Sequence, residues 1–119
     1  MKSYRELLIW QKSILVVTNI YKLTRDFPKE ELFGITSQMR RCAISIPSNI
    51  VEGFGRKSQG DFKRFLNISL GSIYELQTQI EISQNLEYLN TENYKYLMES
   101  CVELEKMMNS LVSKIKAKG

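Results

Sequence analysis

Residues 32–55 read LFGITSQMRRCAISIPSNIVEGFG, and this stretch decides the fold. Its apolar positions recur every three or four residues, at Leu32, Ile35, Met39, Cys42, Ile46 and Ile50. Residues three and four apart share one face of an α-helix, so the stretch predicts an amphipathic helix that ends at Gly53 and Gly55. Pro47 lies within it, where proline removes one backbone hydrogen bond and crowds the preceding turn. We therefore expect a kink between Ala43 and Pro47, or a break.

Three other stretches of the chain have the same spacing. The stretch before it carries a stripe of Leu7, Trp10, Ile14, Val17, Tyr21 and Thr24. The two stretches after it carry Phe62, Phe65, Leu66, Ser69, Ile73, Leu76 and Ile80, and then Tyr94, Leu97, Cys101, Leu104, Met108, Leu111 and Ile115. Ser58 with Asp61 predicts one helix start, and Asn90 or Thr91 predicts the other. Four helices with short connections must alternate in direction, so residues 1–119 are expected to form one all-α domain, an antiparallel up-down-up-down four-helix bundle.

The composition excludes most catalytic chemistry. The 119 residues include no histidine, which removes histidine-based nucleophile systems, general bases and metal sites. The two cysteines, Cys42 and Cys101, fall in apolar stripes and are expected to be inert core residues. We therefore expect no enzyme activity, no cofactor and no metal. The early apolar stretch, residues 7–17, is too short to span a bilayer, so a cytoplasmic protein without a membrane partner is expected.

Positive charge gathers in the middle of a chain whose formal net charge is +4. Residues 38–64 contain six basic residues and two acidic ones: the basic residues are Arg40, Arg41, Arg56, Lys57, Lys63 and Arg64. Such a set can bind the phosphates of RNA or DNA without reading base sequence, and Phe54 nearby could stack on a base. The alternative is an ordinary solvated helix face whose charges pair with acids of neighbouring helices.

Apolar residues also occur opposite the predicted core stripes. They are Leu8 and Leu15 in the first helix and Ile68, Gly71 and Ile82 in the third. An isolated bundle would have polar residues there, and the small Gly71 would let another helix approach closely. We interpret these residues as the interface of a homo-oligomer. Scattered exposed hydrophobic residues, which are normal on protein surfaces, are the alternative.

The segment from Gln38 to Gly53 closely resembles the signature of a bacterial family of four-helix bundles, the 23S rRNA intervening-sequence proteins, which are often labelled ribosomal proteins. Trp10 and the pairs Phe27-Pro28, Asp61-Phe62 and Phe65-Leu66 extend the resemblance over essentially the whole chain. The family is similar to the accessory proteins of diversity-generating retroelements. That similarity implies a homopentamer with a basic, nucleic-acid-binding surface and no enzymatic activity.

Ser45, Asn49 and Glu52 form a polar line along the second helix, because they are four and three residues apart. They either satisfy the backbone around Pro47 and hold Arg40 or Arg41, or they contact a ligand or RNA. The leading hypothesis for the whole chain is an oligomeric, non-catalytic accessory protein that binds RNA or DNA electrostatically. The rival is an oligomeric scaffold that binds another protein and has no nucleic-acid role.

Overall fold

Four long helices follow the four apolar stripes. The computed structural model describes residues 3–115, which contain α1 (Leu8–Thr24), α2 (Ile35–Phe54), α3 (Gln59–Asn85) and α4 (Thr91–Lys114). Short 3₁₀ turns, η1 (Tyr4–Glu6) and η2 (Lys29–Glu31), precede α1 and α2. The predicted all-α fold of four helices is confirmed.

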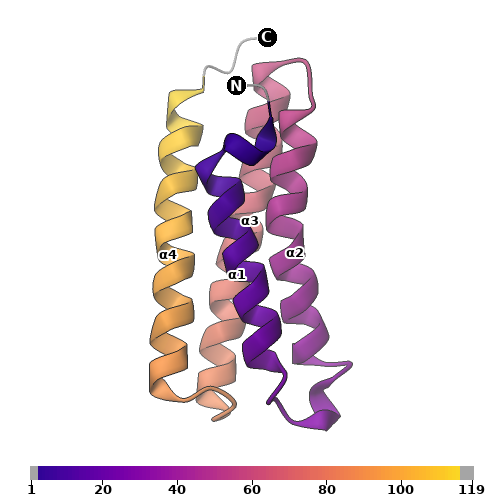
Figure 1. Cartoon of the computed structure of the whole chain (residues 1–119), viewed down its shortest axis with the longest axis vertical. Helices are drawn as coiled ribbons and strands as arrows, with labels where there is room; N and C mark the ends of the chain where they lie inside the picture. The colour runs from indigo at the N-terminus through magenta and orange to yellow at the C-terminus, as the bar shows by residue number, and fades with distance from the viewer. Residues whose placement is uncertain (1–2, 116–119) are drawn as a thin grey trace.

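The helices form a closed ring of neighbours. α1 packs against α2 and α4, and α3 packs against the same two helices, within a rod of 46 × 23 × 20 Å. Figure 1 shows the α2–α3 connection at the same end of the rod as the start of α1 and the end of α4. The α1–α2 and α3–α4 connections lie at the opposite end. Side chains from all four helices therefore meet at each end of the rod.

Side-chain caps fix the starts of α3 and α4. The Ser58 hydroxyl accepts a hydrogen bond from the Asp61 amide at 3.1 Å, as the sequence predicts. The Asn90 side chain accepts one from the Asn93 amide at 2.7 Å. Each cap satisfies an amide that has no partner within its own helix.

The core follows the predicted stripes of α2, α3 and α4. The residues with essentially no exposed surface include Met39, Ile46, Ile50, Leu66, Ile73, Leu76, Ile80, Leu97, Cys101, Leu104 and Met108. Leu32 is a correction, because it lies in the connection before α2 and is exposed. A helix face begins only where the helix itself begins, so the spacing of Leu32 to Ile35 carries no information about its burial.

The prediction for α1 is correct at the two ends of the stripe, Leu7 and Thr24, which are buried, but is wrong by about one residue in phase between them. Its buried face consists of Ile9, Ser13, Val16, Ile20 and Thr24. Trp10 and Val17 are only partly buried at its edge, and Ile14 is exposed. Ser13 is buried because its hydroxyl donates to the Trp10 carbonyl oxygen at 2.7 Å. The spacing of apolar residues in a sequence cannot identify a core position that is occupied by a hydrogen-bonded serine.

α2 continues through Pro47 as one helix, so the break considered for this position does not occur. A kink at Pro47 stays a prediction. The α2–α3 contact near the proline is tight, because the Ser69 hydroxyl of α3 donates to the Ile46 carbonyl oxygen at 2.8 Å. Among residues 3–115, no helix is long and apolar enough to cross a membrane.

Candidate nucleic-acid interface

The α2–α3 turn brings basic residues to one end of the rod. Gly55 caps α2, its amide donating to the Val51 carbonyl oxygen at 3.1 Å, and Ser58 caps α3. Only Arg56 and Lys57 lie between these two caps. A turn this short is fixed by the helices on both sides, so its two cations have a defined place at the end of the bundle.

Gly53 has a different role from the helix end that the sequence predicts for it. It lies inside α2 and is buried, and the cap is Gly55 instead. A Cβ atom at Gly53 would lie 2.7 Å from Cβ of Phe65 and 3.2 Å from the Phe62 carbonyl oxygen. Glycine is required here because the start of α3 passes directly against the backbone of α2.

Two arginines are held against one aromatic ring. The guanidinium carbons of Arg56 and Arg64 lie 4.8 and 4.5 Å from the centre of the Phe65 ring. Arg56 also pairs with Glu52 at 3.2 Å, and Arg64 pairs with Asp61 at 3.6 Å. Cation–π contacts and ion pairs restrict these side chains without covering all of their donors. The two guanidinium groups are therefore held in place at the end of the rod.

The neighbouring lysines are not engaged in this way. Neither Lys57 nor Lys63 takes part in an ion pair or side-chain hydrogen bond with the part of the chain that the structure describes. The first turn of η1 contributes Arg5 to the same end, and the last turn of α4 contributes Lys114. We call this surface the basic end: it consists of Arg5, Arg56, Lys57, Lys63, Arg64 and Lys114, with Glu6, Glu52 and Asp61 as its acids. Cations outnumber carboxylates on it, so its field is positive.

The structure separates Arg40 and Arg41 from the other four predicted nucleic-acid-binding residues. Arg40 precedes Arg56 by 16 residues along the chain, a distance of about 24 Å at the usual helical rise. Arg40 packs over the Tyr21 ring at 4.8 Å, and its Nε–H donates to Thr24 Oγ1 at 3.0 Å. Arg41 is exposed beside it. The six residues therefore form two groups at opposite ends of the rod.

Phe54 lies at the same end of the rod. It is partly buried and packs edge-to-face against Phe62, with 6.4 Å between ring centres. Phe54 also lines a hollow of about 200 Å³ together with Arg56 and Lys57. Stacking of a base on Phe54 stays a prediction.

The polar line of α2 divides into two roles. The Ser45 hydroxyl donates to the Cys42 carbonyl oxygen at 2.6 Å and lies 2.7 Å from the Ser72 hydroxyl of α3, while the Asn49 side chain donates to the Ser45 carbonyl oxygen at 2.8 Å. Both side chains bind backbone of α2, and Ser45 also joins α2 to α3 through Ser72. Glu52 instead holds Arg56, and none of the three holds Arg40 or Arg41.

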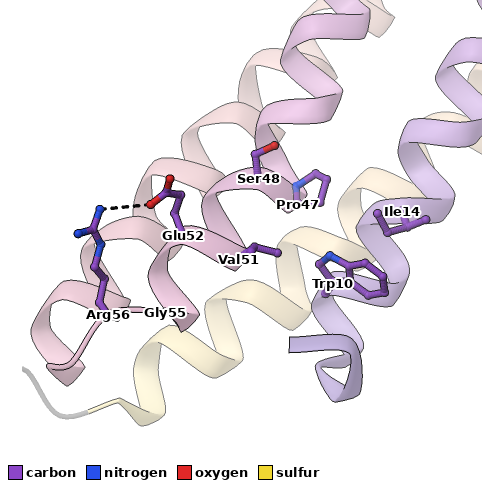
Figure 2. Close-up of a pocket in the computed structure, with 8 residues that line it drawn as sticks. All are labelled: Trp10, Ile14, Pro47, Ser48, Val51, Glu52, Gly55 and Arg56. Carbon is purple, nitrogen blue, oxygen red and sulfur yellow. Dashed lines mark hydrogen bonds and ion pairs between the residues drawn. The ribbon is translucent and has the colours of Figure 1, made fainter. Parts of the chain in front are cut away.

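A shallow groove of about 690 Å³ runs between α1 and α2 beside the basic end. Figure 2 shows Trp10 and Ile14 of α1 on one wall and Pro47 and Val51 of α2 on the other. The Glu52–Arg56 ion pair forms its rim. The groove is a surface of apolar walls with a charged border, and it continues directly into the basic end.

The five residues predicted to form an oligomer interface all lie at the surface. Leu8 and Leu15 are 67% and 58% exposed, on the flank of α1. Ile68 and Ile82 are exposed on α3, and a Cβ atom at Gly71 between them would have open space around it, with no neighbouring atom within 4 Å. Exposure of large apolar side chains on two different helices provides surfaces that another chain can cover.

The two thiols are placed in the core, as the sequence predicts. Burial raises the pKa of Cys101 from 9.0 to about 12, and burial together with the nearby Glu75 carboxylate raises the pKa of Cys42 to about 12. Because thiolate is the reactive form, neither group is a nucleophile near neutral pH. Among residues 3–115, no three cysteine, aspartate or glutamate side chains are grouped so that they could hold a metal ion.

We expect both thiols to be unreactive toward a thiol reagent such as DTNB near about pH 8 and to react after denaturation. The raised pKa values also predict a loss of stability at high pH. Unfolded thiols ionise above pH 9.0, whereas the folded ones stay protonated to about pH 12, so the folded state loses stability as the pH rises between these values. Rapid labelling of the folded chain would contradict this placement of the thiols.

Comparisons with known proteins agree with the fold. Residues 5–110 match the family described as 23S rRNA-intervening sequence protein. A crystal structure at 1.70 Å of a protein of unknown function from the S23 ribosomal protein family of Bacteroides thetaiotaomicron is similar, with a TM-score of 0.83 and 27% sequence identity. The similarity covers 90% of this chain and 96% of that one. The search of curated proteins found no match. Since the family match extends over most of its length, this chain belongs to the family of 23S rRNA-intervening sequence proteins.

Proposed function

We propose that this chain is a non-catalytic cytoplasmic accessory protein that assembles into a homo-oligomer, with five copies expected, and binds RNA or DNA through the basic end. The observation that carries the proposal is the arrangement at the α2–α3 turn. Arg56 and Arg64 are held on Phe65, and Lys57 and Lys63 beside them have no acidic partner in the described residues. Positioned guanidinium groups and unpaired ammonium groups are what phosphate binding requires.

The positions of the apolar surfaces support a ring. Leu8 and Leu15 lie on the flank of α1 next to α4, where Leu8 lines a hollow with Met107 and Leu111. Ile68 and Ile82 lie on α3, which packs between α2 and α4 and not beside α1. Two different surfaces on different sides of one subunit favour head-to-tail contacts, and such contacts form a ring when the rotation from each subunit to the next closes.

Assembly would strengthen the binding surface. One basic end has only a few more cations than carboxylates, which provides weak attraction for nucleic acid in physiological salt. In a ring of parallel subunits, the basic ends would form one continuous face. Their fields would add, and several weak contacts would act together on one nucleic-acid chain.

The salt dependence of binding tests the proposed function. We expect the affinity for structured RNA and single-stranded DNA to fall steeply as salt rises. The triple variant Arg56→Ala, Lys63→Ala, Arg64→Ala should reduce the slope of log K against log salt by about 2 to 3 per subunit, at roughly 0.7 to 0.9 per lost phosphate contact. Fluorescence anisotropy at several salt concentrations measures this slope.

A matched triple variant provides the control. Lys22→Ala, Arg41→Ala, Lys95→Ala removes the same charge from positions at the other end of the rod, and we expect it to retain most of the affinity. Equal losses in the two variants would contradict a defined binding surface. Absence of binding at low salt would favour the rival function, a scaffold for another protein, for which the groove of Figure 2 would be the first surface to test.

A further inference from the structure

A second hollow lies at the end of the rod opposite the basic end. It has a volume of about 330 Å³ and is bounded by the end of α1, η2 and the first turns of α2. Ligand pockets in proteins have volumes of about 300 to 1,000 Å³. Its apolar wall consists of Phe27, Pro28 and Leu32. The hollow is therefore large enough for a small organic molecule.

The rest of the lining consists of three cations and two threonines, Thr24 and Thr36. Arg25, Lys29 and Arg40 line the hollow, and no carboxylate does. None of these three cations takes part in an ion pair within residues 3–115. Glu31, the last residue of η2, is engaged by the Tyr88 hydroxyl at 2.8 Å and faces the Ile35 amide at 3.4 Å. Asp26 and Glu30 adjoin Arg25 and Lys29 in the chain but are outside the lining, so three positive charges converge on a cavity whose own wall holds no negative charge.

Arg40 is built into this hollow in a fixed position. Its guanidinium lies over the Tyr21 ring at 4.8 Å, and its Nε–H donates to Thr24 Oγ1 at 3.0 Å. Thr24 is buried and its own hydroxyl donates to the Ile20 carbonyl oxygen at 2.7 Å. These contacts leave the N–H donors of both terminal nitrogens of Arg40 without a partner in the described chain. Paired donors of this kind match the oxygens of a phosphate group.

Thr36 adds an unsatisfied hydroxyl. It lines the hollow, is 3% exposed, and its Oγ1 has no hydrogen-bond partner within the described residues. A buried hydroxyl without a partner lowers stability, so a native chain retains one for a reason. Threonine in a helix uses two side-chain rotamers, and a change between them exchanges the hydroxyl with the methyl group. A ligand oxygen in the hollow would give this hydroxyl the acceptor that it lacks.

We propose that this hollow binds a small organic phosphate monoester, with Arg40, Arg25 and Lys29 on the phosphate and the apolar wall on the organic group. The two negative charges of a phosphate monoester suit three unpaired cations better than a single carboxylate charge does. This site is separate from the basic end and does not rest on the proposed function. The two can therefore fail independently.

Titration of the isotope-labelled full chain with phenyl phosphate, followed by NMR, tests the proposal. We expect saturable shifts at the amides of residues 24–27, 29, 36 and 40, with a dissociation constant below about 1 mM. Inorganic phosphate, which has no organic group, should bind at least about tenfold more weakly, and uncharged benzyl alcohol should give no saturable shift at these amides. Benzoate, with one charge, should fall between phenyl phosphate and benzyl alcohol.

Two variants test the binding groups, and two others serve as controls. Arg40→Gln should weaken phenyl phosphate binding at least about tenfold. Thr36→Val keeps the shape of the side chain, so it should weaken binding about tenfold while the free protein melts at the same or a higher temperature. Arg41→Gln, next to Arg40 and outside the lining, should leave the dissociation constant within about twofold, as should the basic-end triple variant.

Several results would overturn the proposal. They are the absence of saturable shifts below about 10 mM phenyl phosphate, equal affinity for benzyl alcohol, and unchanged affinity in folded Thr36→Val. Because Thr36→Val is expected to fold at least as well as the natural chain, a loss of binding in that variant cannot be assigned to unfolding. Loss of binding in Arg41→Gln to the same extent as in Arg40→Gln would also contradict the assignment.

Discussion

Replacing Leu8 and Leu15 together with glutamate is expected to convert the proposed homo-oligomer into monomers of 13.9 kDa. Both side chains are more than half exposed, so the change costs an isolated subunit little. In an assembly, it would place two carboxylates in an apolar contact at every interface, where an unpaired charge costs several kcal/mol. Light scattering during size-exclusion chromatography measures the mass, and circular dichroism checks that the helices remain.

A second double variant separates this effect from a general change of surface charge. Leu32→Glu with Ile44→Glu makes a similar change at apolar residues that are also exposed and that lie before and within α2, outside the proposed interface surfaces on α1 and α3. It should leave the mass unchanged. If the Leu8 and Leu15 variant keeps the mass of the natural chain, the proposed interface on α1 is wrong. Weaker nucleic-acid binding by the monomeric variant would follow from the loss of combined contacts.

The Gly53→Ala variant should be less stable than the natural chain by about 2 kcal/mol, which corresponds to a melting temperature lower by roughly 8 °C. Alanine favours a helix over glycine by about 1 kcal/mol, but the new Cβ would meet atoms that cannot move aside. One is Cβ of Phe65 at 2.7 Å and another is the Phe62 carbonyl oxygen at 3.2 Å. α3 would have to shift away from α2, which would disturb the ring that holds Arg56 and Arg64.

The Gly71→Ala substitution should raise the stability of the subunit, whereas Gly53→Ala should lower it. Gly71 lies within α3, and a Cβ there has no neighbour within 4 Å. Gly71→Ala should therefore stabilise the subunit by about 0.5 to 1 kcal/mol. If another helix approaches Gly71 closely in the assembly, the variant should also assemble more weakly. Thermal unfolding at one fixed protein concentration compares the stability of the two variants. If the Gly53→Ala variant is as stable as the Gly71→Ala variant, the close contact of α2 with α3 at Gly53 is contradicted.

The sequence is sufficient where helix signals are local. Ser58 and Asn90 cap α3 and α4 through side chains that bond amides three residues later, an interaction within one short segment. The stripes of α2, α3 and α4 also predict most of the core correctly, although Ile68 and Ile82 place apolar side chains on the outer side of α3 as well. Helix caps and apolar stripes depend on few residues, so they can be predicted from the sequence without knowing which helices are neighbours.

The phase of α1 is predicted wrongly because this helix is apolar on nearly every side. Leu8, Ile14 and Leu15 are exposed, yet they are as hydrophobic as the buried Ile9 and Val16. Two phases of the helix are then almost equally apolar, and only packing against α2 and α4 selects one. The selected phase includes Ser13, whose burial depends on a hydrogen bond that the sequence does not reveal.

The sites depend on distances between segments that the sequence leaves open. The six basic residues lie close together in the chain, but a continuous α2 separates Arg40 from Arg56 by about 24 Å. The hollow that holds Arg40 combines the end of α1, η2 and the start of α2, and no motif marks it. The need for glycine at position 53 also depends on another helix, because only the approach of α3 excludes a Cβ atom there.

The mass of the natural chain in solution, measured by light scattering over a range of protein concentrations, tests the central claim of self-assembly most directly. The proposed ring predicts a particle of several chains, and five copies of the 13.9 kDa chain would give about 70 kDa. A mass that stays at 13.9 kDa at every concentration would contradict the claim. The exposed leucines and isoleucines of α1 and α3 would then be ordinary surface residues, and no face of combined basic ends would exist.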